Sequence, residues 1–147
     1  MKETFHILVV DGQGGRIGQQ LTEQLLAALP SARLVVVGTN AAATAAMRKA
    51  GAKLAATGEN AVLVNARTAD VILGPVGIVI ADALLGEITP AMAAGVGRAS
   101  ARGAKVILIP VNRCDHIVAG TKSLSVADCI RDAVETTAAL ATGGACG

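Results

Sequence analysis

The stretch Val9–Gly18, with the sequence VVDGQGGRIG, joins an apolar run to an amphipathic segment. The run Phe5–Val10 has the continuous apolar character of a strand that is covered on both faces. The segment after the glycines ends near Leu29 and has apolar residues at every fourth position, as a helix with one buried side does. A strand, a glycine-rich turn and a helix in this order form the setting in which backbone N–H groups bind phosphate. The stretch therefore predicts an α/β fold with an anion site at the start of its first helix.

The glycines follow the spacing G-x-G-G-x-x-G, so Ile17 stands where the common motif G-x-G-x-x-G has its third glycine. We expect Gly12 to allow the tight turn, and Gly14 or Gly15 to let the backbone approach an anion. The loop resembles the GxxGRMG loop of dihydrodipicolinate reductases, which bind nicotinamide dinucleotides. A turn that merely connects strand and helix is the alternative. We predict that a cofactor is bound by Gly12, Gln13, Gly14, Gly15, Arg16, Ile17 and Gly18.

The composition excludes several classes of function. The 147 residues contain 13 Lys and Arg against 11 Asp and Glu, which gives a net charge of +2 and no basic stripe for nucleic acid. Phe5 is the only aromatic residue, so platforms for stacking bases are missing as well. We expect no contact with membranes, because no run reaches the roughly 20 apolar residues of a spanning helix. Three widely spaced cysteines fit a reducing cytoplasm and predict neither a disulfide framework nor a metal site.

Strand and helix patterns alternate along the chain, which predicts right-handed βαβ units and a mostly parallel sheet. We therefore expect an open, doubly wound Rossmann-like sandwich in a single domain over residues 1–147, with Rossmann strand order preferred over flavodoxin-like order. The expected strands are His6–Val10, Arg33–Val37, Lys53–Ala55, Asp70–Leu73, Lys105–Ile109 and His116–Val118. The expected helices run from the glycine loop to Leu29, over Ala41–Ala50, from Glu59 to about Arg67, over Ile78–Leu85, from Pro90 to about Ala101, and from Ser125 onward.

Nearly the whole chain resembles an uncharacterised family of small bacterial Rossmann-like proteins that share an early DGQGG loop. The resemblance supports the fold and implies no particular activity. Besides that loop, it rests on Gly38-Thr39-Asn40, Thr57-Gly58-Glu59-Asn60-Ala61, Asp70–Ile78, Leu85-Gly86-Glu87-Ile88-Thr89-Pro90 and Ile109-Pro110-Val111-Asn112-Arg113-Cys114.

Open α/β sheets bind ligands at the carboxyl ends of their strands, so loops distant in sequence should converge there. The residues beyond the glycine loop that we predict to bind a cofactor are Thr39, Asn40, Gly74, Pro75, Asn112 and Arg113. The second strand is not followed by the acid that usually holds an unphosphorylated ribose, because no acid lies between Glu23 and Glu59. With Arg48 and Lys49 further along the next helix, NADP is favoured over NAD. The missing acid equally weakens the case for a dinucleotide, which leaves another nucleotide as the alternative.

Three residues are candidates for chemistry. Arg113 has the planar fork that binds a carboxylate or phosphate. Cys114 would be a nucleophile if Arg113 or His116 lowered the pKa of its thiol; otherwise it is a half-buried thiol in a loop. Asp11 is either a catalytic base or an Asx-turn residue that caps a neighbouring N–H.

Other polar residues are expected to be structural. His6 is interpreted as a core or sheet-end residue. Asp82 and Glu87 are interpreted as solvated.

The leading functional hypothesis is a protein that binds a small-molecule nucleotide or dinucleotide, in one version as an NADP-linked oxidoreductase. The alternatives are a non-catalytic module that senses a nucleotide or another anion, and a transferase that uses Asn112-Arg113-Cys114. Whether the chain is an enzyme stays open, since its length leaves no room for a separate substrate domain. We expect a homo-oligomer with Ala91–Ala101 as its interface, because small residues allow close helix contact and the apolar fraction is high.

Overall fold

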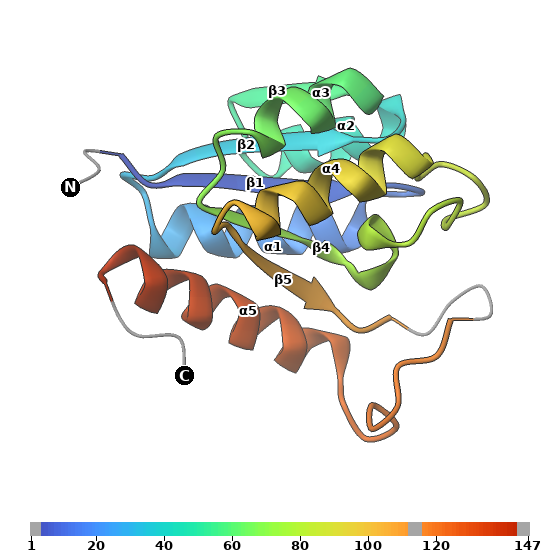
Figure 1. Ribbon diagram of the computed structural model, residues 1–147. Coiled ribbons are helices and arrows are strands. Elements are labelled where there is room, and N and C mark those ends of the chain that lie inside the picture. The colour runs from blue at the N-terminus through green and yellow to red at the C-terminus, as the bar shows by residue number, and fades with distance from the viewer. Residues whose placement is uncertain (1–3, 112–115, 144–147) are drawn as a thin grey trace.

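Strands and helices alternate from residue 6 onward in the computed structural model, which describes residues 4–111 and 116–143. Within these residues, five parallel strands form one sheet in the order β3-β2-β1-β4-β5. This is Rossmann order, so the predicted fold class and strand order are confirmed (Figure 1). The elements are β1 (His6–Asp11), α1 (Arg16–Ala28), β2 (Arg33–Gly38), α2 (Ala41–Lys49), β3 (Leu54–Thr57), α3 (Glu59–Ala66), β4 (Val71–Pro75), the 3₁₀ helix η1 (Val76–Val79), α4 (Pro90–Ala101), β5 (Lys105–Ile109) and α5 (Val126–Ala141).

Strand pairing brings the carboxyl ends of the strands to one edge of the sheet. Asp11 is paired with Gly38 across β1 and β2, and Pro75 is paired with Ile109 across β4 and β5. Because all pairs are parallel, the loops that follow these residues leave the sheet on the same side. The strand order reverses between β1 and β4, because β2 and β3 follow on one side of β1 whereas β4 and β5 lie on its other side. The glycine loop begins at this point.

Two apolar layers hold the helices to the sheet. On one face, β1 and β2 residues pack with Leu21 and Leu25 of α1, Met47 of α2 and Ile130 of α5. On the other face, the strands pack with residues of α3 and α4, including Val96. Figure 1 shows the same division, with α5 below the sheet and α4 on the opposite side. Both faces of the strands are therefore covered, which explains their continuous apolar composition.

Local capping signals give three helix starts as predicted. Asn40 accepts a hydrogen bond from the Ala43 N–H at 2.8 Å, and Thr89 accepts one from the Met92 N–H at 3.1 Å, before Pro90 at the first helical position. Ser125 accepts one from the Asp128 N–H at 3.0 Å. These residues are good caps because a short polar side chain satisfies an N–H that the first turn of a helix leaves without a partner.

Two expected elements are absent from the described residues. The helix predicted over Ile78–Leu85 is wrong: η1 ends at Val79 and turns follow up to Glu87. Asp82, Leu84 and Leu85 have φ values of 66°, 57° and 56°, which are incompatible with a right-handed helix. The strand predicted over His116–Val118 is also wrong, because only His116 forms an isolated bridge.

Gly97 offers a test of how α4 is packed. A Cβ at this position would have no heavy atom within 4 Å, whereas a Cβ at Gly95 would lie 2.6 Å from Leu63 Cδ2 of α3. We expect Gly97→Ala to raise the free energy of unfolding by about 0.5–1 kcal/mol, because alanine loses less backbone entropy than glycine in a helix. Urea denaturation followed by circular dichroism measures the change. Gly95→Ala is the matched control: it should gain less or lose stability, and equal gains would contradict this account of the α3–α4 contact.

Candidate functional site

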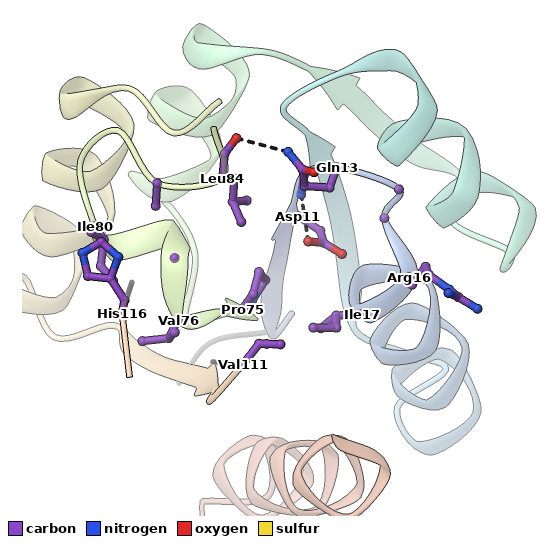
Figure 2. A pocket seen from close by; sticks show the side chains of 15 residues that line it. Asp11, Gln13, Arg16, Ile17, Pro75, Val76, Ile80, Leu84, Val111 and His116 are labelled. Carbon is purple, nitrogen blue, oxygen red and sulfur yellow. Dashed lines mark hydrogen bonds between the residues drawn. The ribbon is translucent and has the colours of Figure 1, made fainter. Parts of the chain in front are cut away.

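A pocket lies at the carboxyl edge of the sheet, between the ends of β1 and β4. Figure 2 shows Pro75 between two sides of this pocket, with Ile17 on the α1 side and His116 next to Ile80 on the other. Leu84 reaches the pocket from the turns after η1, and Val111 reaches it from beyond β5. The complete lining is Asp11, Gly12, Gln13, Gly14, Gly15, Arg16, Ile17, Pro75, Val76, Gly77, Ile80, Ala83, Leu84, Val111 and His116.

The two central glycines of the loop have different roles. Gly15 is the residue before α1, with a φ of 70°, and an added Cβ would lie 2.7 Å from Ala43 Cα and 2.8 Å from Ala43 O. Gly15 therefore allows α1 and α2 to approach each other. A Cβ at Gly14 would meet only Arg16 Cγ, at 3.9 Å, and Gly14 is exposed toward the pocket. Of these two glycines, Gly14 is the one that leaves room for a ligand at the backbone.

Asp11 caps the start of α1 from below the loop. Its carboxylate accepts hydrogen bonds from the Gly12 N–H at 2.8 Å and from the Gly18 N–H at 2.6 Å, and the residue is buried. A Cβ at Gly18 would lie 2.6 Å from Met47 Sδ, so this glycine allows the helix to pack closely, as expected. Of the two interpretations of Asp11, the geometry matches the one in which it caps neighbouring N–H groups.

Glu87 links the glycine loop to the end of β2, so its interpretation as a solvated residue is wrong. Its Oε1 accepts hydrogen bonds from the Gln13 N–H at 3.0 Å, Thr39 Oγ1 at 2.6 Å and Asn40 Nδ2 at 2.7 Å. Its Oε2 accepts one from Gln13 Nε2, which also donates to Leu84 O at 3.2 Å (Figure 2). Four donors from two separate loops thus converge on one half-buried carboxylate. Asp82, in contrast, is exposed as expected.

The hydrogen bonds around Glu87 make folding sensitive to acid. Burial raises the pKa of Glu87, but the hydrogen bonds from Thr39, the Gln13 N–H, Asn40 and the Gln13 side chain together lower this pKa below its usual value. A pKa that is lower in the folded state stabilises the fold above the unfolded pKa, and this stabilisation is lost as the pH falls through the folded pKa.

We therefore expect the wild-type protein to be more stable than Glu87→Gln at about pH 7. The difference in their free energies of unfolding should become smaller as the pH is lowered to about 3. Urea denaturation at both pH values, followed by circular dichroism, measures the difference. Glu135→Gln, at an exposed position on α5, is the control and should show no such trend. A difference for Glu87→Gln that does not change with pH would contradict the assignment.

The structure brings some of the predicted site residues together and separates others. Gly12 to Ile17 and Pro75 line the pocket, whereas Gly18 and Gly74 lie below its surface, with an added Cβ at Gly74 overlapping Val10 O. Thr39 and Asn40 bind Glu87 and are not part of the lining. The side chain of Arg16 points away from the pocket (Figure 2). Asn112, Arg113 and Cys114 lie outside the described residues, so their predicted roles stay predictions.

Several other expectations concern residues away from the pocket. His6 is the first residue of β1, at the amino end of the sheet, as expected of a sheet-end histidine. In the described ranges, no group of three or more His, Cys, Asp or Glu side chains could hold a metal ion. No helix in that part of the chain has the length and apolar content to cross a membrane. Self-association through α4 stays a prediction.

Among the residues missed from the sequence are Glu87 and the pocket-lining residues Ile80, Ala83 and Leu84. All four come from the segment that the sequence assigned to a helix and its break. Part of this segment was marked by the family resemblance, which includes Leu85-Gly86-Glu87-Ile88-Thr89-Pro90. Nothing in the local sequence pattern, however, indicated that the Glu87 carboxylate reaches the end of β2.

Comparison with known proteins adds one extensive match. The family model described as "Domain of unknown function (DUF3842)" matches residues 6–142. No curated protein matches the chain. A crystal structure of a dodecameric FMN-dependent UbiX-like decarboxylase from Escherichia coli O157:H7 is 15% identical, with a TM-score of 0.43 over 93% of this chain and 94% of that chain. The structure of TubZ from Clostridium botulinum phage c-st is 11% identical, with a TM-score of 0.41 over 95% of this chain and 48% of that chain.

Proposed function

The chain belongs to the family described as a domain of unknown function (DUF3842), and from its site we propose that it is a nucleotide-binding protein. The phosphate of the ligand binds at the start of α1. The rest of the nucleotide lies against the apolar side chains that β4 and the turns after it contribute to the pocket.

The observation that carries the proposal is the open backbone at Gly14 beside an apolar pocket. In the described part of the chain, the N–H groups of Gly14, Arg16 and Ile17 donate no hydrogen bond to another residue. They lie at the positive end of the α1 dipole, where a phosphate is favoured. Asp11 uses other donors, the N–H groups of Gly12 and Gly18, so its carboxylate and a phosphate do not compete for the same hydrogen bonds.

The apolar part of the pocket supports a ligand with a ring system as well as a phosphate. Pro75, Val76, Ile80, Leu84 and Val111 supply most of its side chains. Small-molecule sites combine such apolar walls with a few polar groups that fix orientation. The pocket also lies at the point between β1 and β4 where open α/β sheets bind their ligands.

Isothermal titration calorimetry with ligands that differ only by a phosphate tests the proposal. FMN is compared with riboflavin, and AMP with adenosine; NADPH is included as the cofactor that the sequence favours. We expect at least one nucleotide to bind and its phosphate-free partner to bind at least about tenfold more weakly, since charged hydrogen bonds contribute roughly 1.5–3 kcal/mol each. No binding of FMN, AMP or NADPH, or equal binding of a nucleotide and its phosphate-free partner, would overturn it.

A further inference from the structure

We infer that this nucleotide site takes mononucleotides and excludes dinucleotides, because Glu87 and Leu84 fill the half of the crevice above β2. The inference rests on the proposed function and names the class of ligand.

In a Rossmann site that holds a dinucleotide, the two halves lie on either side of the first glycine turn, and a ribose lies at the end of the second strand. Here the end of β2 carries Thr39 and Asn40, and both donate to Glu87 Oε1, at 2.6 and 2.7 Å. The carboxylate therefore occupies the place next to β2 from which a ribose is normally held.

The space above the first glycine is filled as well. A Cβ added at Gly12 would lie 2.6 Å from Thr39 Oγ1, 2.9 Å from Leu84 Cδ1 and 3.0 Å from Glu87 Oε1. Three side chains from two different loops thus meet over this position. The pocket accordingly extends from the glycine loop toward Pro75, Ile80 and Val111. The residues on the β2 side, Thr39, Asn40 and Glu87, do not contribute to its lining.

The charges on the β2 side also oppose NADP, the dinucleotide that the sequence favours. The Glu87 carboxylate would repel a phosphate on a ribose at the end of β2. Arg48 and Lys49 are the basic residues expected to compensate, but they lie in the last turn of α2. Lys49 is about 12 Å along the helix from Ala41, the first residue of α2, at a rise of 1.5 Å per residue.

Glu87 also holds the glycine loop that covers this half of the crevice. Gln13 has a φ of 52°, and both its N–H and its side-chain amide donate to Glu87. Removing the carboxylate removes four hydrogen bonds between the loops. The β2 half should then open, while the N–H groups of Arg16 and Ile17, which belong to α1, stay in place to bind the phosphate.

The test compares each mononucleotide with the dinucleotide that contains it: FMN with FAD, and AMP and nicotinamide mononucleotide with NAD. Calorimetry is carried out on wild type, Glu87→Ala and Glu135→Ala, the last being a charge-matched change at an exposed position of α5. In wild type we expect the mononucleotide to bind at least about tenfold more tightly than the dinucleotide. Glu87→Ala should reduce this ratio several-fold by strengthening dinucleotide binding, and Glu135→Ala should leave it unchanged.

A wild-type protein that binds a dinucleotide as tightly as its mononucleotide would overturn the inference and leave the proposed function intact. Absence of binding by every nucleotide would instead remove the proposed function itself. An unchanged ratio in a folded Glu87→Ala protein would show that Glu87 does not set the preference. Circular dichroism establishes whether this variant folds; if it does not, the wild-type ratio alone decides.

Discussion

Replacing Gly14 with valine is expected to lower the affinity for the bound nucleotide by about 100-fold or more while the fold is retained. The added side chain would occupy the space where the backbone faces the pocket, and so would separate a phosphate from the N–H groups at the start of α1. Loss of two charged hydrogen bonds accounts for a change of this size. Calorimetry with the tightest nucleotide of the panel measures the affinity, and a thermal melt measures the fold.

The control for this variant is Gly97→Val on α4, where an added Cβ meets no heavy atom within 4 Å. It introduces the same side chain far from the glycine loop and should leave the affinity unchanged. If Gly14→Val binds as wild type does, the phosphate does not lie at this loop. An equal loss in both variants would point to a general effect of added apolar surface.

Replacing Gly15 with alanine should destabilise the fold by about 3 kcal/mol or more, although the change is only one methyl group. A left-handed conformation costs a non-glycine residue about 1–2 kcal/mol, and the new Cβ would also overlap the backbone of Ala43. Because the clash is with backbone at the start of α2, no side-chain rotation relieves it. Urea denaturation followed by circular dichroism gives the free energy of unfolding.

Gly120→Ala separates the two contributions to that loss. Gly120 has a φ of 87° and no heavy atom within 4 Å of an added Cβ, so it incurs the conformational cost without the overlap. The free energy of unfolding of Gly120→Ala should fall by no more than about 1–2 kcal/mol. Equal losses at Gly15 and Gly120 would show that the contact with Ala43 contributes nothing.

The parts of the fold that the sequence predicted depend on local patterns. Continuous apolar runs gave the four longer strands, because a strand covered on both faces needs no polar side chains. Asn40 and Thr89 gave two helix starts, because a cap acts on N–H groups three residues away. The glycine loop predicted the position of the pocket. The loop directly follows β1, so it must lie at the carboxyl edge of a parallel sheet, where such folds bind ligands.

The contacts of Glu87 were not predictable in this way. Its partner Gln13 is 74 positions away in the chain, and Asn40 is 47 positions away. Leu84 and Leu85 adopt left-handed conformations that a leucine avoids in isolation, so their local preference indicated a helix. Hydrogen bonds from the distant Gln13 to Leu84 O and to Glu87, together with the hydrogen bond from the Asp82 N–H to Ile88 O within the segment, determine its conformation instead.

The turns that contain Asp82, Leu84 and Leu85 have a consequence for how a ligand reaches its site. Left-handed conformations at three non-glycine residues reduce the free energy needed to open this segment, whereas the burial of Ala83 and Ile88 in the apolar layer beside α4 opposes its opening. The amide hydrogens of Asp82 and Ile88 should therefore exchange with solvent through local opening, well before those of β1 and β4. Because Leu84 from this segment lines the pocket, we expect this wall of the pocket to open locally while the rest of the domain stays folded.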